Sequence, residues 1–387
     1  MNEIPIHRLQ RYAFAAGILG CCLGALGCAW HPRDFFVSYL FSYLFWIGLS
    51  LGCFQAALIH YLTGGRWGAV GLRMFEAGYM TLPLMAVLFV PLLFGLRDLY
   101  PWAQSAALAA NKVLQQRAAY ENVTGFVLRA VFVFAVWIVI AVRLRKWSLQ
   151  QDNTDDIAPT LKLRSLSGPA MVLVPLTATF AFVDWIMSTE AAWFSTIFGV
   201  ILLADELLLA FAAVILLLAL FQRHAPFSRV VTPKEYHDLG NLLLTFVLFW
   251  TYVAFSQFLI VYAGDQPREI EWYLHRVEGG WRWLIGIIAV FHFFVPFFLL
   301  LFRSVKQRVR RLVLIAALIV MAQVLATFWV VVPTFYPLQF HWMDAAAWIG
   351  VGGIWVGVFA ANLKRHPLLA KNNPLVQTAL TKTVDAK

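Results

Sequence analysis

Four side chains that can exchange protons lie inside long apolar stretches of this sequence: Asp184, Asp205, Glu206 and His292. Asp184, for example, lies about one helical turn from the end of the apolar stretch 168–188. A charged side chain inside a bilayer costs roughly 2.5–3.5 kcal/mol, so a chain keeps one where it faces a partner, a water path or a substrate. These residues therefore predict a protein whose interior handles protons or polar ligands.

Asp205 and Glu206 are adjacent and lie near the middle of one apolar stretch. Neighbouring residues of an α-helix point about 100° apart, so the two carboxylates cannot face the same partner. We expect one to face the interior of a helix bundle and the other to face a helix interface. Two charges side by side at mid-membrane are costly, so one carboxylate is expected to hold a proton, as a proton carrier would.

A second polar group lies near the ends of two consecutive apolar stretches. His60 ends one stretch, and Arg73 and Glu76 begin the next. Arg73 and Glu76 are three residues apart, share a helical face and can form an ion pair within reach of His60. The group either pins a helical hairpin or forms the cytoplasmic mouth of a proton path, and both interpretations stay open.

Polar and aromatic residues mark the other membrane face. Gln257 lies there, next to the aromatic-rich loop 265–282, and joins the candidates for a proton path. Tryptophan and tyrosine form belts at membrane surfaces, which is one interpretation of this loop. The alternative is a docking surface for an extracytoplasmic redox subunit.

The composition indicates what must position these residues. The 387 residues are 61% hydrophobic and 13% charged, with a mean hydropathy of +0.74, whereas an ordinary soluble domain is about 25% charged. We expect an all-α integral membrane protein with ten transmembrane helices, each near the ~20 residues that cross the bilayer, and the first retained rather than cleaved. The expected spans are 12–30, 36–62, 71–95, 126–142, 168–188, 194–221, 239–262, 281–302, 312–332 and 345–363.

Positive charge predicts the orientation. About three quarters of the Lys and Arg residues fall at the amino end, in alternate loops and in the polar tail 364–387. By the positive-inside rule both termini lie in the cytoplasm, which suits a multi-pass protein of a bacterial inner membrane. The same alternation explains the net charge of +10, so we expect no nucleic-acid partner.

Glycines and prolines predict where helices pack closely or bend. Three glycine pairs at a spacing of four residues are typical of tight helix contacts, and prolines inside spans kink helices. The segment 97–122 is expected to form one surface helix. The glycine pairs are Gly20 with Gly24, Gly48 with Gly52, and Gly353 with Gly357; the prolines are Pro83, Pro91, Pro175 and Pro296.

The sequence has no signature of a bound redox cofactor. Its four cysteines form neither a CxxC pair nor a CxxCH haem-attachment motif, and its histidines lie at mismatched depths for axial haem ligation. We therefore expect no covalently bound or metal cofactor, while quinone or quinol stays open as a ligand. The cysteines are Cys21, Cys22, Cys28 and Cys53.

Several segments, taken in order, resemble one family of membrane proteins. The chain is similar to the second quinone-type membrane subunit of alternative complex III, a quinol:cytochrome c oxidoreductase, within the polysulfide reductase/NrfD-like family. The resemblance covers most of the chain. The segments that carry it are 35–68, 81–102, 182–199, 238–283 and the aromatic end of the ninth span with Phe328, Trp329 and Pro333.

The resemblance implies ten helices arranged as two four-helix bundles with two flanking helices, which agrees with the count of spans. It also implies assembly with an iron–sulfur subunit, multihaem cytochrome subunits and a sister NrfD-like subunit that is the better candidate for quinol oxidation. Relatives often carry a carboxylate in the ninth span, where this chain has Gln323, Ala326 and Thr327. The Asp205–Glu206 pair is not a motif of the family.

These arguments lead to a functional hypothesis with one alternative. The chain would be a non-redox subunit of a quinol-oxidising respiratory complex, not catalytic alone, that scaffolds the complex and conducts protons. The bundles would span about 36–190 and 194–335, flanked by helices 12–30 and 345–363 and followed by a cytoplasmic tail. The alternative is a stand-alone proton-coupled transporter, which would leave the membrane as a single active chain.

Overall fold

The computed structural model describes residues 6–191, 193–370 and 372, and throughout these residues the regular elements are helices. Within the described residues, ten helical spans are long and apolar enough to cross a membrane. The expectation of an all-α, multi-pass membrane protein is therefore confirmed. The six uninterrupted spans are α1 (Ile6–Trp30), α2 (Pro32–Thr63), α8 (Val123–Gln151), α10 (Phe198–Phe221), α12 (Pro233–Gly264) and α18 (Trp342–Lys364).

The other four spans are built from two or three consecutive helices. A break follows Tyr79 just before Pro83, and the eighth span contains a π-helical turn just before Pro296. Proline lacks the amide hydrogen that would continue the helical ladder, so both irregularities occur where the sequence favours them. The pieces are α3 (Arg66–Tyr79) with α4 (Leu82–Phe94), α9 (Ala158–Trp185) with η2 (Met187–Thr189), α14 (Trp281–Ile288) with η3 (Ala289–Phe294) and α15 (Val295–Leu301), and α17 (Val309–Val331) with η4 (Val332–Thr334).

The expectation of a single surface helix over 97–122 is wrong. Short helices occupy the segment instead, because Pro101 interrupts the chain and Asn111 caps a new helix by accepting a hydrogen bond from the Val113 amide at 2.9 Å. These helices are α5 (Leu96–Leu99), η1 (Pro101–Ala103), α6 (Ser105–Ala110) and α7 (Lys112–Arg117). The remaining connecting helices are α11 (Phe227–Val230), α13 (Pro267–His275) and α16 (Arg303–Lys306).

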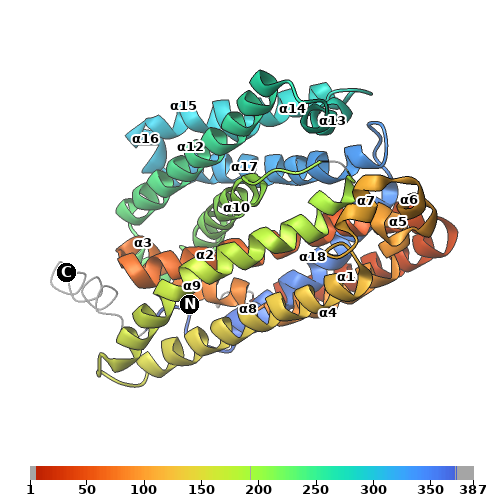
Figure 1. The fold of residues 1–387 in the computed structure, drawn as a ribbon. Helices are drawn as coiled ribbons and strands as arrows, with labels where there is room; N and C mark the ends of the chain where they lie inside the picture. Colours follow the sequence, from red (N-terminus) through yellow and green to blue (C-terminus); the bar gives the residue numbers. More distant parts are fainter. Residues whose placement is uncertain (1–5, 192, 371, 373–387) are drawn as a thin grey trace.

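The spans pack as two groups of four with a flanking pair (Figure 1). One group comprises α2, α3 with α4, α8 and α9; the other comprises α10, α12, α14 with α15, and α17. The two groups meet where α2 packs along α10, and α2 is buried along most of its length. The outer pair, α1 and α18, packs against α2.

Glycines allow the closest helix contacts, as their spacing predicts. A Cβ atom built on Gly20 of α1 would lie 2.5 Å from the backbone nitrogen of Gly350 on α18. A Cβ atom on Gly52 of α2 would overlap the backbone carbonyl of Glu206 on α10. These two glycines therefore let backbones approach where no side chain fits.

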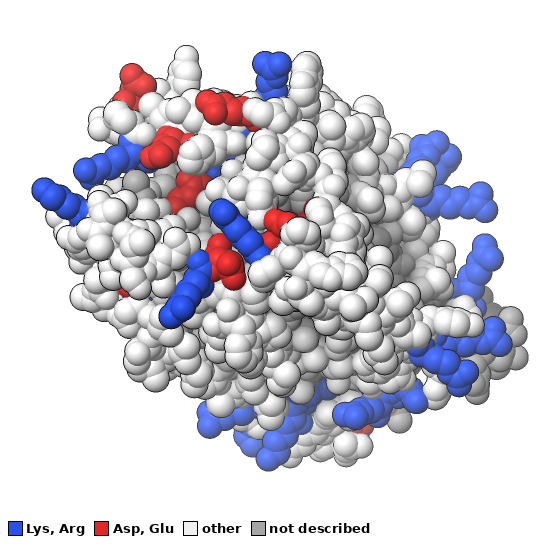
Figure 2. All heavy atoms as spheres, turned by 90° about the vertical axis from the view of Figure 1, so that its right-hand side faces the viewer, with Lys and Arg blue, Asp and Glu red and all other residues white. Residues whose placement is uncertain are grey.

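The ten spans leave both described ends of the chain on one side, which we call the terminal side; the loops α5–α7 and α13 lie on the opposite side. Figure 2 faces this opposite side, where acidic and basic side chains are mixed. The expectation of a loosely ordered tail concerns 364–387, of which residues 371 and 373–387 lie outside the described residues.

Candidate functional site

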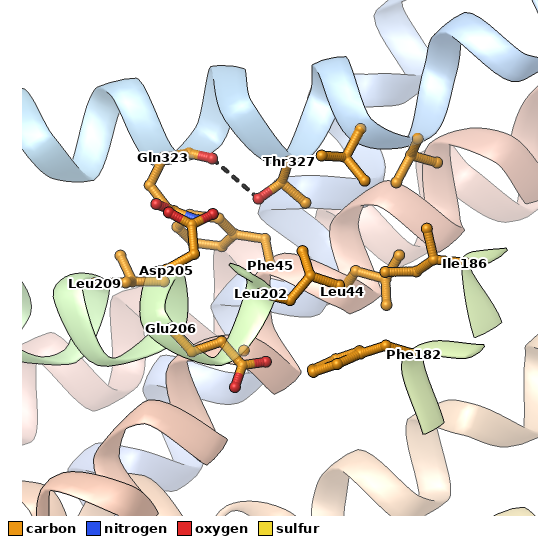
Figure 3. A pocket seen from close by; sticks show the side chains of 13 residues that line it. Leu44, Phe45, Phe182, Ile186, Leu202, Asp205, Glu206, Leu209, Gln323 and Thr327 are labelled. Atoms are coloured by element: carbon orange, nitrogen blue, oxygen red, sulfur yellow. Dashed lines mark hydrogen bonds between the residues drawn. The ribbon is translucent and has the colours of Figure 1, made fainter. Parts of the chain in front are cut away.

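Asp205 and Glu206 of α10 face two different helices, as predicted. Asp205 accepts a hydrogen bond from the side-chain amide of Gln323 on α17, with its Oδ2 atom 2.6 Å from Nε2. Glu206 points to the other side of α10 (Figure 3) and accepts from Gln55 of α2, with Oε2 3.3 Å from Nε2. Both carboxylates are buried. Asp205 thus faces the interior of the second helix group, and Glu206 lies between the two groups.

Two glycines of α2 make room for Glu206. The side chain of Glu206 lies against Gly48, where an added Cβ would be 3.2 Å from the Cγ atom, and its backbone lies against Gly52. The glycine spacing noticed in the sequence therefore serves this site. It brings α2 close enough for Gln55 to reach the carboxylate.

His292 completes the central group from the π-helical turn η3. Its Nε2 atom lies 3.7 Å from Oδ1 of Asp205, too far for a hydrogen bond in this conformation, and its ring packs 4.4 Å from that of Trp250. A π-helical turn inserts one extra residue, and such turns are frequent at functional sites. The sequence identified His292 but not the turn that presents it.

Several buried polar atoms in this centre have no hydrogen-bond partner among the described residues. They are Oδ1 of Asp205, Oε1 of Gln323 and both ring nitrogens of His292, although the side chains of Gln323 and His292 lie near enough to interact. Buried polar atoms almost always find a partner, and ordered water commonly supplies it. The centre is therefore equipped to hold water between a carboxylate, an amide and an imidazole.

A small cavity adjoins the two carboxylates. Its volume is about 30 Å³, which is enough for one or two water molecules. Thr327 and Val330 of α17 line it on the side that leads away from Gln323 toward the opposite membrane face. Ile186, which follows α9, also lines it, and Figure 3 shows Thr327 and Ile186. Among the described residues no Lys or Arg pairs with Asp205 or Glu206. A negative charge on either carboxylate is therefore not balanced by a cation, and the protonated, neutral form costs less free energy than the charged form.

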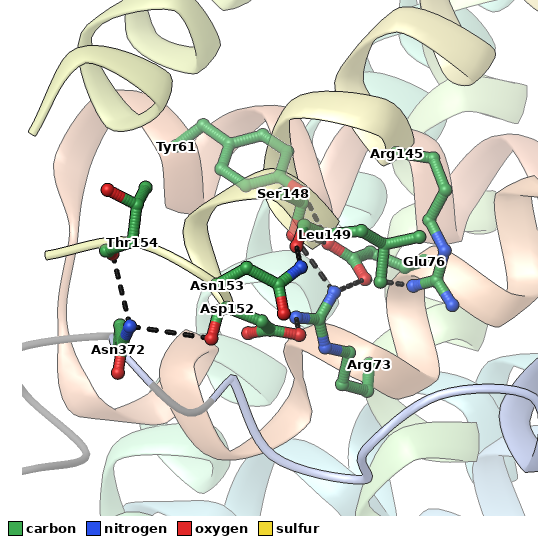
Figure 4. Close-up of polar contacts among 10 residues, drawn as sticks. All are labelled: Tyr61, Arg73, Glu76, Arg145, Ser148, Leu149, Asp152, Asn153, Thr154 and Asn372. Carbon is green, nitrogen blue, oxygen red and sulfur yellow. Dashed lines mark hydrogen bonds and ion pairs between the residues drawn. The ribbon is translucent and has the colours of Figure 1, made fainter. Parts of the chain in front are cut away.

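Glu76 lies in a separate cluster on the terminal side (Figure 4). It forms ion pairs with Arg73, at 2.5 Å, and with Arg145 of α8, which confirms the predicted Arg73–Glu76 pair. Ser148 of α8 and Tyr61 of α2, the latter at 2.8 Å, donate hydrogen bonds to the same carboxylate. Four hydrogen-bond donors from three spans therefore converge on one acid.

Arg73 also reaches beyond Glu76. It pairs with Asp152 at 2.5 Å and donates to Ser148 at 3.0 Å. The sequence analysis missed the partners on α8, although Arg145 and Ser148 are three residues apart and face the same way on a helix. The signal was present in the spacing, but only the fold shows which helix this face meets.

His60 does not join this cluster within the described residues. Its ring lies against Gly68, where no side chain intervenes, and 5.6 Å from the ring of Trp67. Its Nδ1 atom has no hydrogen-bond partner in the described part of the chain. Trp67 and Gly68 of the next helix pack against the imidazole, and Glu76 is near enough to interact with it electrostatically.

Asp184 and Gln257 lie toward the opposite side and apart from the centre. Arg129 of α8 holds Asp184 with two hydrogen bonds, of 2.7 Å from Nε and 3.1 Å from Nη2. Gln257 accepts a hydrogen bond from Ser195 at 2.9 Å. Asp184 therefore has a cationic partner that the sequence analysis did not identify.

The opposite side also contains a buried ion pair that the sequence analysis missed. Arg276, which follows α13, pairs with Glu190 at 2.7 Å and donates to the Val330 carbonyl at 2.7 Å. Its guanidinium lies 3.8 Å from the ring centre of Trp272. Burial lowers the pKa of Arg276, and Glu190 acts against this shift. The four-residue spacing of Trp272 and Arg276 could have indicated this contact. The sequence analysis instead considered the loop only as an aromatic belt or a docking surface.

Comparisons with protein-family models and with curated proteins find no match to this chain. Among the described residues, no group of three or more His, Cys, Asp or Glu side chains is arranged to hold a metal ion. The geometry of the three polar clusters is therefore the basis for assigning a function: the central Asp205 group, the Glu76 cluster and the Glu190–Arg276 pair.

Proposed function

We propose that this protein is a non-redox membrane subunit of a quinol-oxidising respiratory complex, in which it conducts protons and anchors its neighbours. The observation that carries the proton role is the pair of buried carboxylates, Asp205 and Glu206, each bound by an amide and neither by a cation. The ordered segments that resemble the second membrane subunit of alternative complex III support the respiratory assignment.

The proposed path would enter on the terminal side at Glu76. Tyr61 connects this acid to α2, and Gln55 lies six residues, or about 9 Å, earlier on the same helix. Gln55 in turn binds Glu206. The buried hydroxyl of Tyr79 on α3 interacts with that of Tyr61 near this gap and supplies a further exchangeable proton.

From the centre the path would leave through the cavity. Thr327 and Val330 line it, and the Val330 carbonyl accepts a hydrogen bond from Arg276. Glu190, bound to Arg276, would be the last acid before the opposite surface. On this proposal the polar clusters act in series, with His292 adjusting the charge of Asp205 across 3.7 Å.

The proposal includes partners and a location. The partners are an iron–sulfur subunit, multihaem cytochrome subunits and a sister NrfD-like subunit that oxidises quinol, with any quinone contact of this chain secondary. The distribution of Lys and Arg supports a bacterial inner membrane with the terminal side in the cytoplasm.

Purification in mild detergent through a tag on the tail tests the assembly. Mass spectrometry and a visible spectrum should reveal multihaem cytochrome and iron–sulfur subunits in the eluate. A colourless single chain that moves protons in vesicles would instead support the transporter, since the buried carboxylates suit both functions.

Asp205→Asn tests the proton role in the purified complex. We expect quinol oxidation to continue while proton release per electron falls, because an amide cannot carry the proton. Thr251→Val is the matched control, since this hydroxyl bonds the Val247 carbonyl of its own helix at 2.8 Å. An unchanged proton-to-electron ratio in an intact Asp205→Asn complex would rule out this path.

A further inference from the structure

A groove between α8 and α9 opens toward the bilayer. Its volume is about 200 Å³, and its lining is almost entirely apolar. Two phenylalanines form its walls: the side chain of Phe132 is 62% exposed and that of Phe180 is 50% exposed. On membrane-spanning helices such exposure faces hydrocarbon, so the occupant of the groove has an apolar part.

The groove has one polar end. The Arg129–Asp184 ion pair lines it there, with Asp184 buried and the side chain of Arg129 26% exposed. Arg129 also donates to the Tyr120 carbonyl at 3.0 Å, and its guanidinium lies 3.8 Å from the ring centre of Tyr120. One surface of this cation therefore stays open to a ligand that arrives from the bilayer.

The position of Arg129 along α8 sets the depth of this polar end. The helix is uncharged from residue 130 to residue 142, which covers about 20 Å. Arg129 thus lies near the level at which lipid headgroups meet hydrocarbon. From there the groove runs toward the membrane centre as far as Thr177, seven residues or about 10 Å from Asp184 along α9.

The exposed charge near the polar end is positive. Arg117 lies beside Glu121 at 3.6 Å, and Glu121 also interacts electrostatically with Arg129. Burial raises the pKa of Glu121, while Arg117 and Arg129 act in the other direction. In both ion pairs the guanidinium is the more exposed member: the side chain of Arg117 is 30% exposed against 10% for Glu121, and that of Arg129 is 26% exposed against 4% for Asp184. A ligand that arrives from the bilayer therefore meets the two cations before the two acids.

We propose that this groove binds a single anionic phospholipid from the leaflet on the opposite side, with the phosphate at Arg129 and one acyl chain along Phe132, Phe180 and Ala181. Asp184 and the Tyr120 carbonyl take three of the five N–H groups of Arg129, and the remaining two can donate to phosphate oxygens. The acyl chain enters the groove from hydrocarbon and not from water, so its burial brings no hydrophobic gain. Packing within the groove and the phosphate contact therefore supply the affinity. The site is independent of the proton path, because none of its lining residues belongs to the central cavity.

Native mass spectrometry of the full chain in detergent tests the site, with palmitoyl-oleoyl phosphatidylglycerol as the added lipid. We expect one tightly retained lipid, and less retention of the zwitterionic phosphatidylcholine. Ala181→Trp should reduce retention by about tenfold, because the indole overpacks the groove and takes the place of the acyl chain. Leu173→Trp on the lipid-facing side of the same helix is the control and should retain the lipid.

A second variant keeps the test decisive where Ala181→Trp does not fold. Phe132→Ala combined with Phe180→Ala removes the exposed walls and leaves the buried packing in place, so it should weaken retention in a folded protein. Equal retention in wild type and in this double variant would overturn the proposal. A dimer that dissociates on Ala181→Trp, with no retained lipid in wild type, would assign the groove to a second copy and overturn it as well.

Discussion

Glu76, Asp205 and Glu206 are all buried within membrane-spanning helices, but their hydrogen-bond and ion-pair partners differ. Glu76 meets two arginines, a serine and a tyrosine, whereas Asp205 and Glu206 each meet one amide. A buried charge is tolerated where cations and donors surround it. Glu76 is therefore suited to hold three helices together at the entrance of the proposed path, and the central acids are suited to change their protonation within it.

The Glu76 cluster predicts a large loss of stability on substitution. Glu76→Gln leaves Arg73 and Arg145 buried without their shared carboxylate, and we expect a cost of about 3–5 kcal/mol. Thermal unfolding of the detergent-solubilised protein, followed by size-exclusion chromatography, measures the effect. Arg117→Gln removes a partly exposed pair at 3.6 Å and a hydrogen bond to the Ala191 carbonyl at 3.0 Å, and it should cost less than Glu76→Gln because neither partner is fully buried. Similar losses in the two variants would contradict this account.

At the scale of elements, close contacts between backbones organise the molecule. The α1–α18 pair and the α2–α10 pair both depend on glycine where another backbone lies within van der Waals distance. The second of these contacts also sets the distance between Gln55 and Glu206. The packing of helices and the geometry of the central site are thus determined by the same residues.

Two glycine-to-alanine substitutions should have opposite effects. Gly353→Ala places a methyl group against the backbone of Gly17, and overpacking of this kind costs typically 1–3 kcal/mol. Gly286→Ala in α14 meets nothing within 4 Å, so we expect a gain of about 0.5–1 kcal/mol from helix propensity. The unfolding midpoints of both variants measure the difference. A destabilised Gly286→Ala together with an unaffected Gly353→Ala would contradict the packing described here.

Hydropathy and spacing predicted the elements better than their partners. Ten apolar stretches gave the ten spans, and the glycine pairs and Pro83 indicated close contacts and a break, because these are local properties of the chain. The π-helical turn at His292 and the short helices between Arg97 and Asn122 depend on tertiary context. Asp184 finds its partner Arg129, and Arg276 its partner Glu190, in segments that are far apart in the chain. The spacing of residues in one sequence cannot predict such pairs.

At the scale of the whole molecule, the fold arranges polar groups across the membrane. The Glu76 cluster lies on the terminal side, the Asp205 group lies at the centre, and the Glu190–Arg276 pair lies toward the opposite side. The cavity covers only part of this distance. Any proton transfer along this line therefore needs water or side-chain movement between Gln55 and Tyr61.

The proposed orientation can be measured with single cysteines in intact cells. Gln104→Cys on the opposite side should react with a membrane-impermeant maleimide, whereas Asp155→Cys on the terminal side should react only after permeabilisation, as the positive-inside rule requires. The reverse pattern would place both described ends outside the cytoplasm. The background for both variants replaces the natural cysteines Cys21, Cys22, Cys28 and Cys53 with alanine.

The pairing of α1 with α18 has a consequence for biosynthesis. The glycine face of α1 is synthesised before its partner surface on α18, which follows more than 300 residues later. Until α18 has been made, this part of α1 has only lipid or another protein to pack against. A chain that stops before α18 keeps the glycine face uncovered, which gives membrane quality control a feature that distinguishes such truncated chains.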